Sequence, residues 1–123
     1  MGNMDQMHVL VVDDDQDIID AMTDVLRQEG YRVSAAHDGA EALSMLRANA
    51  HPRVILLDWM MPGMDGATFA EEKRRDPALA AIPVVLLTAD ARASTKAADA
   101  GIGAFLRKPV TLDDLLSMLE RYR

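Results

Sequence analysis

Three short runs of the sequence are apolar from end to end, at Val9–Val12, Val54–Leu57 and Pro83–Leu87. A strand with one solvent-facing side alternates apolar and polar residues, whereas a strand that is apolar throughout is buried on both faces. Such strands are typical of parallel sheets covered by helices on both sides. Two weaker runs, Arg32–Ala36 and Ala104–Arg107, complete a set of five predicted strands.

Segments with the apolar spacing of amphipathic helices alternate with these strands. Helices are predicted from Ile18 to Leu26 with Gly30 as a stop signal, from Gly39 past Leu46, from Phe69 to Arg75, from Ala91 to Ala100, and from Thr111 through Leu119. Thr111 and Asp114 resemble a capping box at the start of the last helix. Five strand–helix units with right-handed crossovers predict one doubly wound α/β domain.

The composition excludes several classes of protein. The net charge of −7 argues against a nucleic-acid binder, and the absence of cysteine excludes disulfides and thiolate zinc sites. The apolar runs are too short to span a membrane, and the first residues lack a secretory signal, so we expect a cytoplasmic protein. The charge is uneven, because residues 1–90 carry 7 basic and 16 acidic side chains and residues 91–123 carry 6 and 4.

Polar residues stand where the predicted strands end: Asp13 and Asp14 after the first, Asp58 after the third, Thr88 after the fourth and Lys108 after the fifth. Parallel strands end at one edge of the sheet, so these side chains are expected to converge there. Crowded carboxylates raise one another's pKa and favour a hard cation such as Mg²⁺. An ammonium and a hydroxyl suit phosphoryl oxygens, which leaves one carboxylate as a nucleophile that forms an aspartyl phosphate.

Four motifs, "VVDDD", "LLDWMMPGMDG", "LTA" and "AFLRKP", occur in order and at suitable spacings. With them, residues 8–123 resemble a CheY-like receiver domain of a response regulator, preceded by a short tail of residues 1–7. The resemblance implies a flavodoxin-like (βα)5 fold with a parallel sheet in the order 2-1-3-4-5.

The resemblance also implies a function. The chain is expected to be the phosphoacceptor receiver of a two-component system or phosphorelay, with a sensor histidine kinase or a histidine phosphotransfer protein as phosphodonor. It would not be an enzyme beyond its own phosphorylation and dephosphorylation. A downstream protein target is implied but not identified, and neither nucleic acid nor membrane is expected to bind directly.

By the same resemblance, Asp58 is the phosphoacceptor and Mg²⁺ is the cofactor. Asp14 would bind the metal directly, Asp13 largely through water, and Asp58 and the backbone carbonyl of Met60 would complete the protein ligands. Lys108 would pair with the phosphoryl group.

The resemblance further implies a switch. The peptide bond between Lys108 and Pro109 would be cis. Thr88 would move to hydrogen-bond the phosphoryl group, and Phe105 would turn inward behind it. The change would reach the surface formed by residues 91–123, whose positive excess suits an acidic or mixed-charge partner helix.

The stretch "DDDQD" is open to two other interpretations. An EF-hand loop requires glycine at its sixth position, where this sequence has Ile18, and the segment before the aspartates is a strand. Asp13 and Asp15 also resemble the start of a haloacid-dehalogenase-type phosphatase, whose nucleophile lies on the first strand. Phosphate on Asp13 rather than Asp58 would favour that enzyme class.

Several other polar and aromatic residues are not expected to take part in the chemistry of the site. Asp15 and Asp17 are interpreted as anions at a helix N-terminus, and Trp59 as a surface aromatic beside the site. No role is assigned to His8, His37 or His51. Because the sequence ends just after the last predicted helix, both a stand-alone receiver and a receiver from a longer protein remain open.

Overall fold

A computed structural model describes residues 6–48, 51–59, 66–90, 92–99 and 101–123. The elements alternate along the chain: β1 His8–Val12, α1 Gln16–Gln28, β2 Arg32–Ala36, α2 Gly39–Arg47, β3 Val54–Asp58, α3 Gly66–Arg75, β4 Val84–Thr88, α4 Ala93–Asp99, β5 Ala104–Arg107 and α5 Leu112–Glu120. All neighbouring strands pair in parallel, in the order β2-β1-β3-β4-β5. This confirms the doubly wound α/β fold and the strand order.

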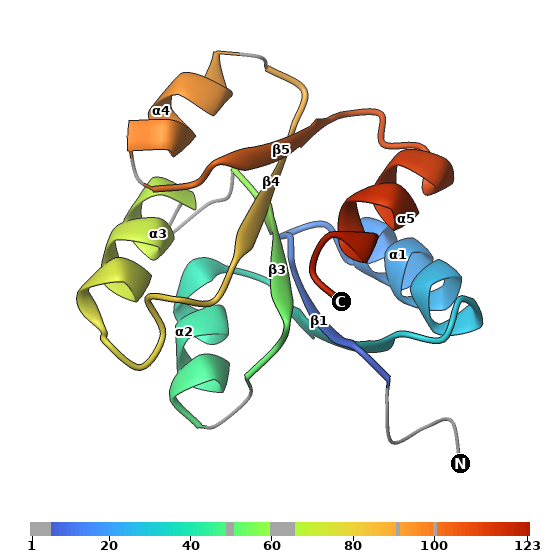
Figure 1. Cartoon of the computed structure of the whole chain (residues 1–123), viewed down its shortest axis with the longest axis horizontal. Coiled ribbons are helices and arrows are strands. Elements are labelled where there is room, and N and C mark those ends of the chain that lie inside the picture. The colour runs from blue at the N-terminus through green and yellow to red at the C-terminus, as the bar shows by residue number, and fades with distance from the viewer. Residues whose placement is uncertain (1–5, 49–50, 60–65, 91, 100) are drawn as a thin grey trace.

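Helices cover both faces of the sheet, with α1 and α5 on one side and α2 and α3 on the other (Figure 1). Successive strand residues point to opposite faces. In β1, Leu10 joins a cluster that contains Leu46 of α2 and Phe69 of α3, whereas Val9 joins a cluster that contains Leu26 of α1. The central strands are therefore buried on both faces, which is why their sequences are apolar throughout.

Side-chain caps fix three helix starts. The Asp15 carboxylate accepts a hydrogen bond from the Asp17 N–H at 2.9 Å at the start of α1. Asp38 accepts one from the Glu41 N–H at 2.7 Å, and Thr111 accepts one from the Asp114 N–H at 3.1 Å. Each cap stabilises its helix by about 1 kcal/mol. The interpretation of Asp15 as a helix N-terminal residue rather than a metal ligand agrees with this geometry.

The observed boundaries differ slightly from the expected ones. β4 begins at Val84 rather than Pro83, because proline has no N–H to donate to the sheet, although its carbonyl accepts from the Ile55 N–H at 2.9 Å. α3 begins at Gly66, before the first large apolar residue of its pattern. Gly30 follows α1 with φ of 92°, a conformation that favours glycine and ends the helix.

The expectation that Trp59 lies on the surface is wrong. Its side chain is buried, in the same cluster as Leu57 and Phe69. Trp59 follows the last residue of β3, and Gly66 at the start of α3 lies directly against it: a Cβ atom at position 66 would be 2.8 Å from the indole Cε3. The glycine therefore leaves room for the indole beneath the first turn of α3.

None of the described helices is long and apolar enough to cross a membrane.

Candidate functional site

The C-terminal edge of the sheet gathers polar residues from four strands. Asp13 follows β1, Asp58 ends β3, Thr88 ends β4 and Lys108 follows β5. The parallel register sets these strand ends side by side, since Val12 pairs with Leu57 on β3, and Asp58 pairs in turn with Leu87 on β4. Met60 lies outside the described residues, and Phe105 lies near the start of β5; the other predicted site residues lie at this edge of the sheet.

Three carboxylates form a cluster at this edge. Asp13, Asp14 and Asp58 each offer one oxygen atom, and the three atoms lie within 4.8 Å of one another. Asp13 and Asp58 are buried, whereas Asp14 is exposed. Three carboxylate oxygens at one edge of the sheet fit a hard divalent cation. Because Asp14 is exposed, such a cation could keep some of its water ligands.

Asp13 has an oxygen atom without a protein hydrogen bond. Its Oδ1 accepts from the Asp15 N–H at 2.9 Å, but its buried Oδ2 has no hydrogen-bond partner among the described residues. Such an atom costs about 1–3 kcal/mol unless a ligand, water or ion satisfies it. A cation within the carboxylate cluster would satisfy it, so the residues present fit Mg²⁺.

The pKa of Asp13 is raised, in the direction expected for crowded acids. Burial is the largest cause, because desolvation disfavours the ionised carboxylate. The hydrogen bond from the Asp15 N–H and the charge of Lys108 act in the opposite direction, and the neighbouring charges of Asp14 and Asp15 raise the pKa further. Repulsion between acids therefore contributes, but burial contributes more.

Lys108 reaches over the acidic cluster. Its Nζ lies 3.5 Å from Asp58 Oδ1 and 3.8 Å from Asp13 Oδ2. The Lys108 N–H donates to the Thr88 carbonyl at 2.8 Å, which extends the pairing of β4 and β5 by one residue. The Lys108–Pro109 peptide bond is cis, as predicted. The Lys108 side chain, about one-quarter exposed, thus places its ammonium beside two buried carboxylates.

Among the described residues, the side-chain hydrogen bonds of Thr88 are with Asp90 rather than with one of the three acids. The Thr88 hydroxyl donates to the Asp90 carbonyl at 3.3 Å and accepts from the Asp90 N–H at 3.1 Å. Phe105 pairs with Leu86 in the sheet, two residues before Thr88 on β4, and its side chain is 43 % exposed. The hydroxyl is held in a local turn, and the aromatic ring lies outward.

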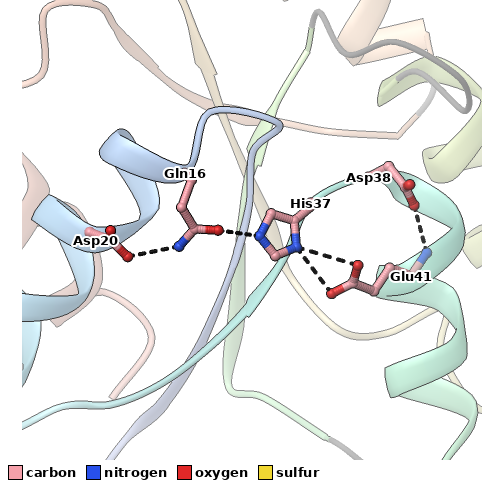
Figure 2. A network of polar contacts seen from close by, with 5 residues as sticks. All are labelled: Gln16, Asp20, His37, Asp38 and Glu41. Carbon is pink, nitrogen blue, oxygen red and sulfur yellow. Dashed lines mark hydrogen bonds and ion pairs between the residues drawn. The ribbon is translucent and has the colours of Figure 1, made fainter.

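A polar network beside the site could not be found from the sequence. The His37 ring lies between Gln16 of α1 and Glu41 of α2, and Gln16 in turn donates to Asp20 at 2.7 Å (Figure 2). The contact between Gln16 and His37 joins residues 21 positions apart. The network links α1, the helix that follows Asp14, to the first turn of α2. His37, for which the sequence predicts no role, therefore connects these two helices.

Comparisons with known proteins agree with this geometry. The family model described as response regulator receiver domain matches residues 9–120. Response regulator MprA of Mycobacterium avium is 38 % identical over 115 residues, which cover 92 % of this chain and 49 % of MprA. The chain therefore spans about half the length of this relative.

Solved structures with the same fold include two informative examples. The chemotaxis response regulator CheY4 of Vibrio cholerae has a TM-score of 0.87 and 31 % identity, covering 96 % of this chain and 99 % of that one. The receiver domain of sensor histidine kinase PA1611 from Pseudomonas aeruginosa, which holds a magnesium ion in its active-site cleft, has a TM-score of 0.86 and 27 % identity, covering 95 % and 97 %.

The family match spans nearly the whole sequence, and the parallel sheet places its polar strand ends together. The chain therefore belongs to the response regulator receiver domain family, the signalling modules of two-component systems.

Proposed function

We propose that this receiver accepts a phosphoryl group on Asp58 in a Mg²⁺-dependent reaction. The observation that carries the proposal is the convergence of three carboxylates with the Lys108 ammonium, 3.5 Å from Asp58 Oδ1. A carboxylate that lies beside an ammonium and two other carboxylates able to hold a metal ion is suited to attack phosphorus and to form an acyl phosphate.

In the proposed step, an oxygen of Asp58 attacks the phosphorus atom of a phosphohistidine on a sensor kinase or phosphotransfer protein. The P–O bond forms as the P–N bond breaks, and the donor imidazole leaves with the electron pair of that bond. Lys108, now beside Asp58 and Asp13, is positioned to follow the incoming negative charge and pair with a phosphoryl oxygen. Hydrolysis by water would reverse the modification, returning the Asp58 carboxylate and inorganic phosphate.

Asp13, Asp14 and Asp58 would hold the metal ion, with the Met60 carbonyl as a further proposed ligand. The ion would neutralise charge on the phosphoryl oxygens during transfer. The buried Asp13 Oδ2, which has no hydrogen-bond partner among the described residues, supports this assignment. The magnesium in the cleft of the PA1611 receiver domain is a precedent from a protein of similar fold.

Thr88 and Phe105 are proposed as the switch. Thr88 would exchange its hydrogen bonds with Asp90 for one with a phosphoryl oxygen. Phe105 would then turn from its exposed position toward the space behind Thr88. The surface that changes would be that of α4, β5 and α5, which is proposed to bind the unidentified downstream protein.

The direct test is intact-mass analysis after incubation with acetyl phosphate. Wild-type protein should gain one phosphoryl group in Mg²⁺ and none in EDTA. Asp58→Asn should gain none, because the amide is not a nucleophile. Asp24→Asn is a matched control, since Asp24 is an exposed aspartate of α1 remote from the strand ends, and it should label like the wild type.

Two outcomes would contradict the proposal. Normal labelling of Asp58→Asn would place the phosphoryl group elsewhere, and a label mapped to Asp13 would favour a phosphatase-type nucleophile on the first strand. If wild-type protein were labelled as fast in EDTA as in Mg²⁺, the reaction would not require the metal ion.

A further inference from the structure

Lys73 lies on the buried side of α3. The buried residues of this helix are Gly66, Phe69, Ala70 and Lys73, which follow the spacing of one helix face. Lys73 is only 6 % exposed, whereas the next two residues, Arg74 and Arg75, are exposed. A lysine thus occupies a core position, where fully buried ammonium groups are rare unless they are paired.

The Lys73 ammonium lacks a counter-charge within the described part of the chain. Its Nζ donates to the Ala80 carbonyl at 3.1 Å, and no carboxylate of the described residues forms an ion pair with it. Burial lowers its pKa, because desolvation disfavours the charged ammonium. An ammonium has three N–H donors, so the carbonyl leaves donor capacity unused.

A small cavity adjoins this ammonium. Lys73 and Arg74 line it together with the turn of residues 80–84 that leads into β4, and with Gly101 and Ile102 before β5. Its volume is about 210 Å³. Because it lies where β4 and β5 begin, it is at the edge of the sheet opposite Asp58; Figure 1 shows α3 beside these strands.

Size and charge define what the cavity can hold. It has room for about seven waters at roughly 30 Å³ each, and it is smaller than the roughly 300–1,000 Å³ of pockets for drug-sized ligands. Arg74 adds a guanidinium at the rim, where it also contacts Glu71 at 2.9 Å and the Asp99 carbonyl at 3.4 Å. The net charge of −7 repels anions in general, so binding of one here would depend on these local cations.

We propose that this cavity binds a small oxyanion, a carboxylate or a phosphate, whose oxygens accept hydrogen bonds from the Lys73 ammonium. A charge-assisted hydrogen bond from the buried ammonium to an oxyanion is stronger than one to a neutral carbonyl, so the anion would supply the counter-charge that the described residues do not provide. This site is separate from the phosphoacceptor site and does not depend on Mg²⁺.

The test is an NMR titration of the metal-free protein with inorganic phosphate and, separately, with acetate, at constant ionic strength against chloride. Amide signals of Ala80, Ala81, Gly101 and Ile102 should shift in a saturable manner with at least one anion. Comparison of the two titrations distinguishes a phosphate from a carboxylate ligand. Lys73→Met should weaken binding at least about tenfold, the loss of one charge-assisted hydrogen bond.

Arg75→Met is the matched control, because it removes an exposed cation of the same helix and should leave the shifts unchanged. The spectrum of Lys73→Met also reports whether that variant is folded, and Arg74→Gln offers a second variant at the rim with an expected partial loss. Absence of saturable shifts near residues 80–84 and 101–102, shifts confined to residues around Asp58, or shifts that persist in Lys73→Met would overturn the proposal.

Discussion

Asp13 and Lys73 are two buried charged residues whose surroundings differ. Asp13 lies beside other carboxylates and Lys108, where a metal ion would satisfy the oxygen that has no hydrogen-bond partner among the described residues. Lys73 lies at the opposite edge of the sheet, with only a backbone carbonyl as acceptor. In both residues burial is the largest cause of the altered pKa, upward for the acid and downward for the base. Both residues should therefore reduce the stability of the protein when no ligand is present.

We expect Asp13→Asn to be more stable than wild type in EDTA, by about 1 kcal/mol. The raised pKa means that the folded state disfavours the ionised carboxylate, mainly through burial, and asparagine keeps the Oδ1 acceptor for the Asp15 N–H. Wild type should gain stability as Mg²⁺ is added, and the variant should gain much less. Urea unfolding with and without Mg²⁺ measures both effects.

Asp24→Asn, on the exposed side of α1, should respond to Mg²⁺ like the wild type. If Asp13→Asn were less stable in EDTA and kept a full response to Mg²⁺, Asp13 would be a structural residue and not part of a metal site.

For Lys73, we expect Lys73→Met to raise the free energy of unfolding by about 1 kcal/mol at neutral pH in chloride buffer. The lowered pKa gives the sign of the pH dependence. In the folded protein Lys73 loses its proton at a lower pH than in the unfolded chain, so the unfolded state binds more protons in that interval. Wild-type stability should therefore rise, relative to the variant, as pH increases from the folded-state pKa toward 10.5.

Urea unfolding at a series of alkaline pH values checks this expectation. Arg75→Met should run parallel to the wild type, because its guanidinium is exposed. A stability difference between wild type and Lys73→Met that stays constant across the alkaline range would show that the ammonium carries no desolvation cost.

At the scale of elements, α3 is fixed at its start by the contact between Gly66 and Trp59. A methyl group at position 66 would lie 2.8 Å from the indole Cε3, and also 3.0 Å and 3.1 Å from the Trp59 Cα and carbonyl oxygen. The indole could shift, but the backbone atoms of a residue that follows a buried strand have little freedom to do so. The close approach therefore couples the end of β3, where Asp58 lies, to the first turn of α3.

Gly66→Ala should destabilise the protein by about 1–3 kcal/mol, because overpacking outweighs the higher helix propensity of alanine. Trp59 is the single tryptophan of the sequence, so its fluorescence follows urea unfolding and reports any displacement of the indole. Gly103→Ala is the control, since nothing lies within 4 Å of the added atom and φ is not positive there. Equal stability of the two variants would mean that the indole is not held as described.

At the scale of the whole molecule, the site joins two unequal halves of the sheet. β1 and β3 are buried centrally, whereas β5 is an edge strand whose alternate residues, Phe105 and Arg107, are exposed. Thr88 and Lys108 belong to the β4–β5 side of the site, and both are proposed to change partners on phosphorylation. A change at Asp58 should thus reach β5 and its neighbouring helices more readily than the central strands, because edge elements open at lower free-energy cost.

We expect phosphorylation to change amide hydrogen exchange in residues 92–99 and 101–123, with little change in α2. Exchange measured by mass spectrometry with acetyl phosphate and Mg²⁺ tests this, and Asp58→Asn under the same conditions should show no change. Exchange differences confined to residues 6–48 would contradict the proposed direction of the switch.

The order of the elements and the residues at the strand ends follow from the sequence. Apolar runs and helical spacing are local properties, so β2, β5 and the start of α2 are predicted at their observed positions, whereas α5 begins at Leu112, one residue after the predicted start, with Thr111 as its cap. Asp13, Asp58, Thr88 and Lys108 are identified by where the strands end. What each side chain contacts follows only from the tertiary structure. Burial of Trp59 and Lys73, the pairing of His37 with Gln16, and the dominance of desolvation at Asp13 all depend on residues that are distant in the sequence or on the packing around them. Periodicity shows which face of a helix or strand is apolar, but it does not show which residues of other elements pack against that face.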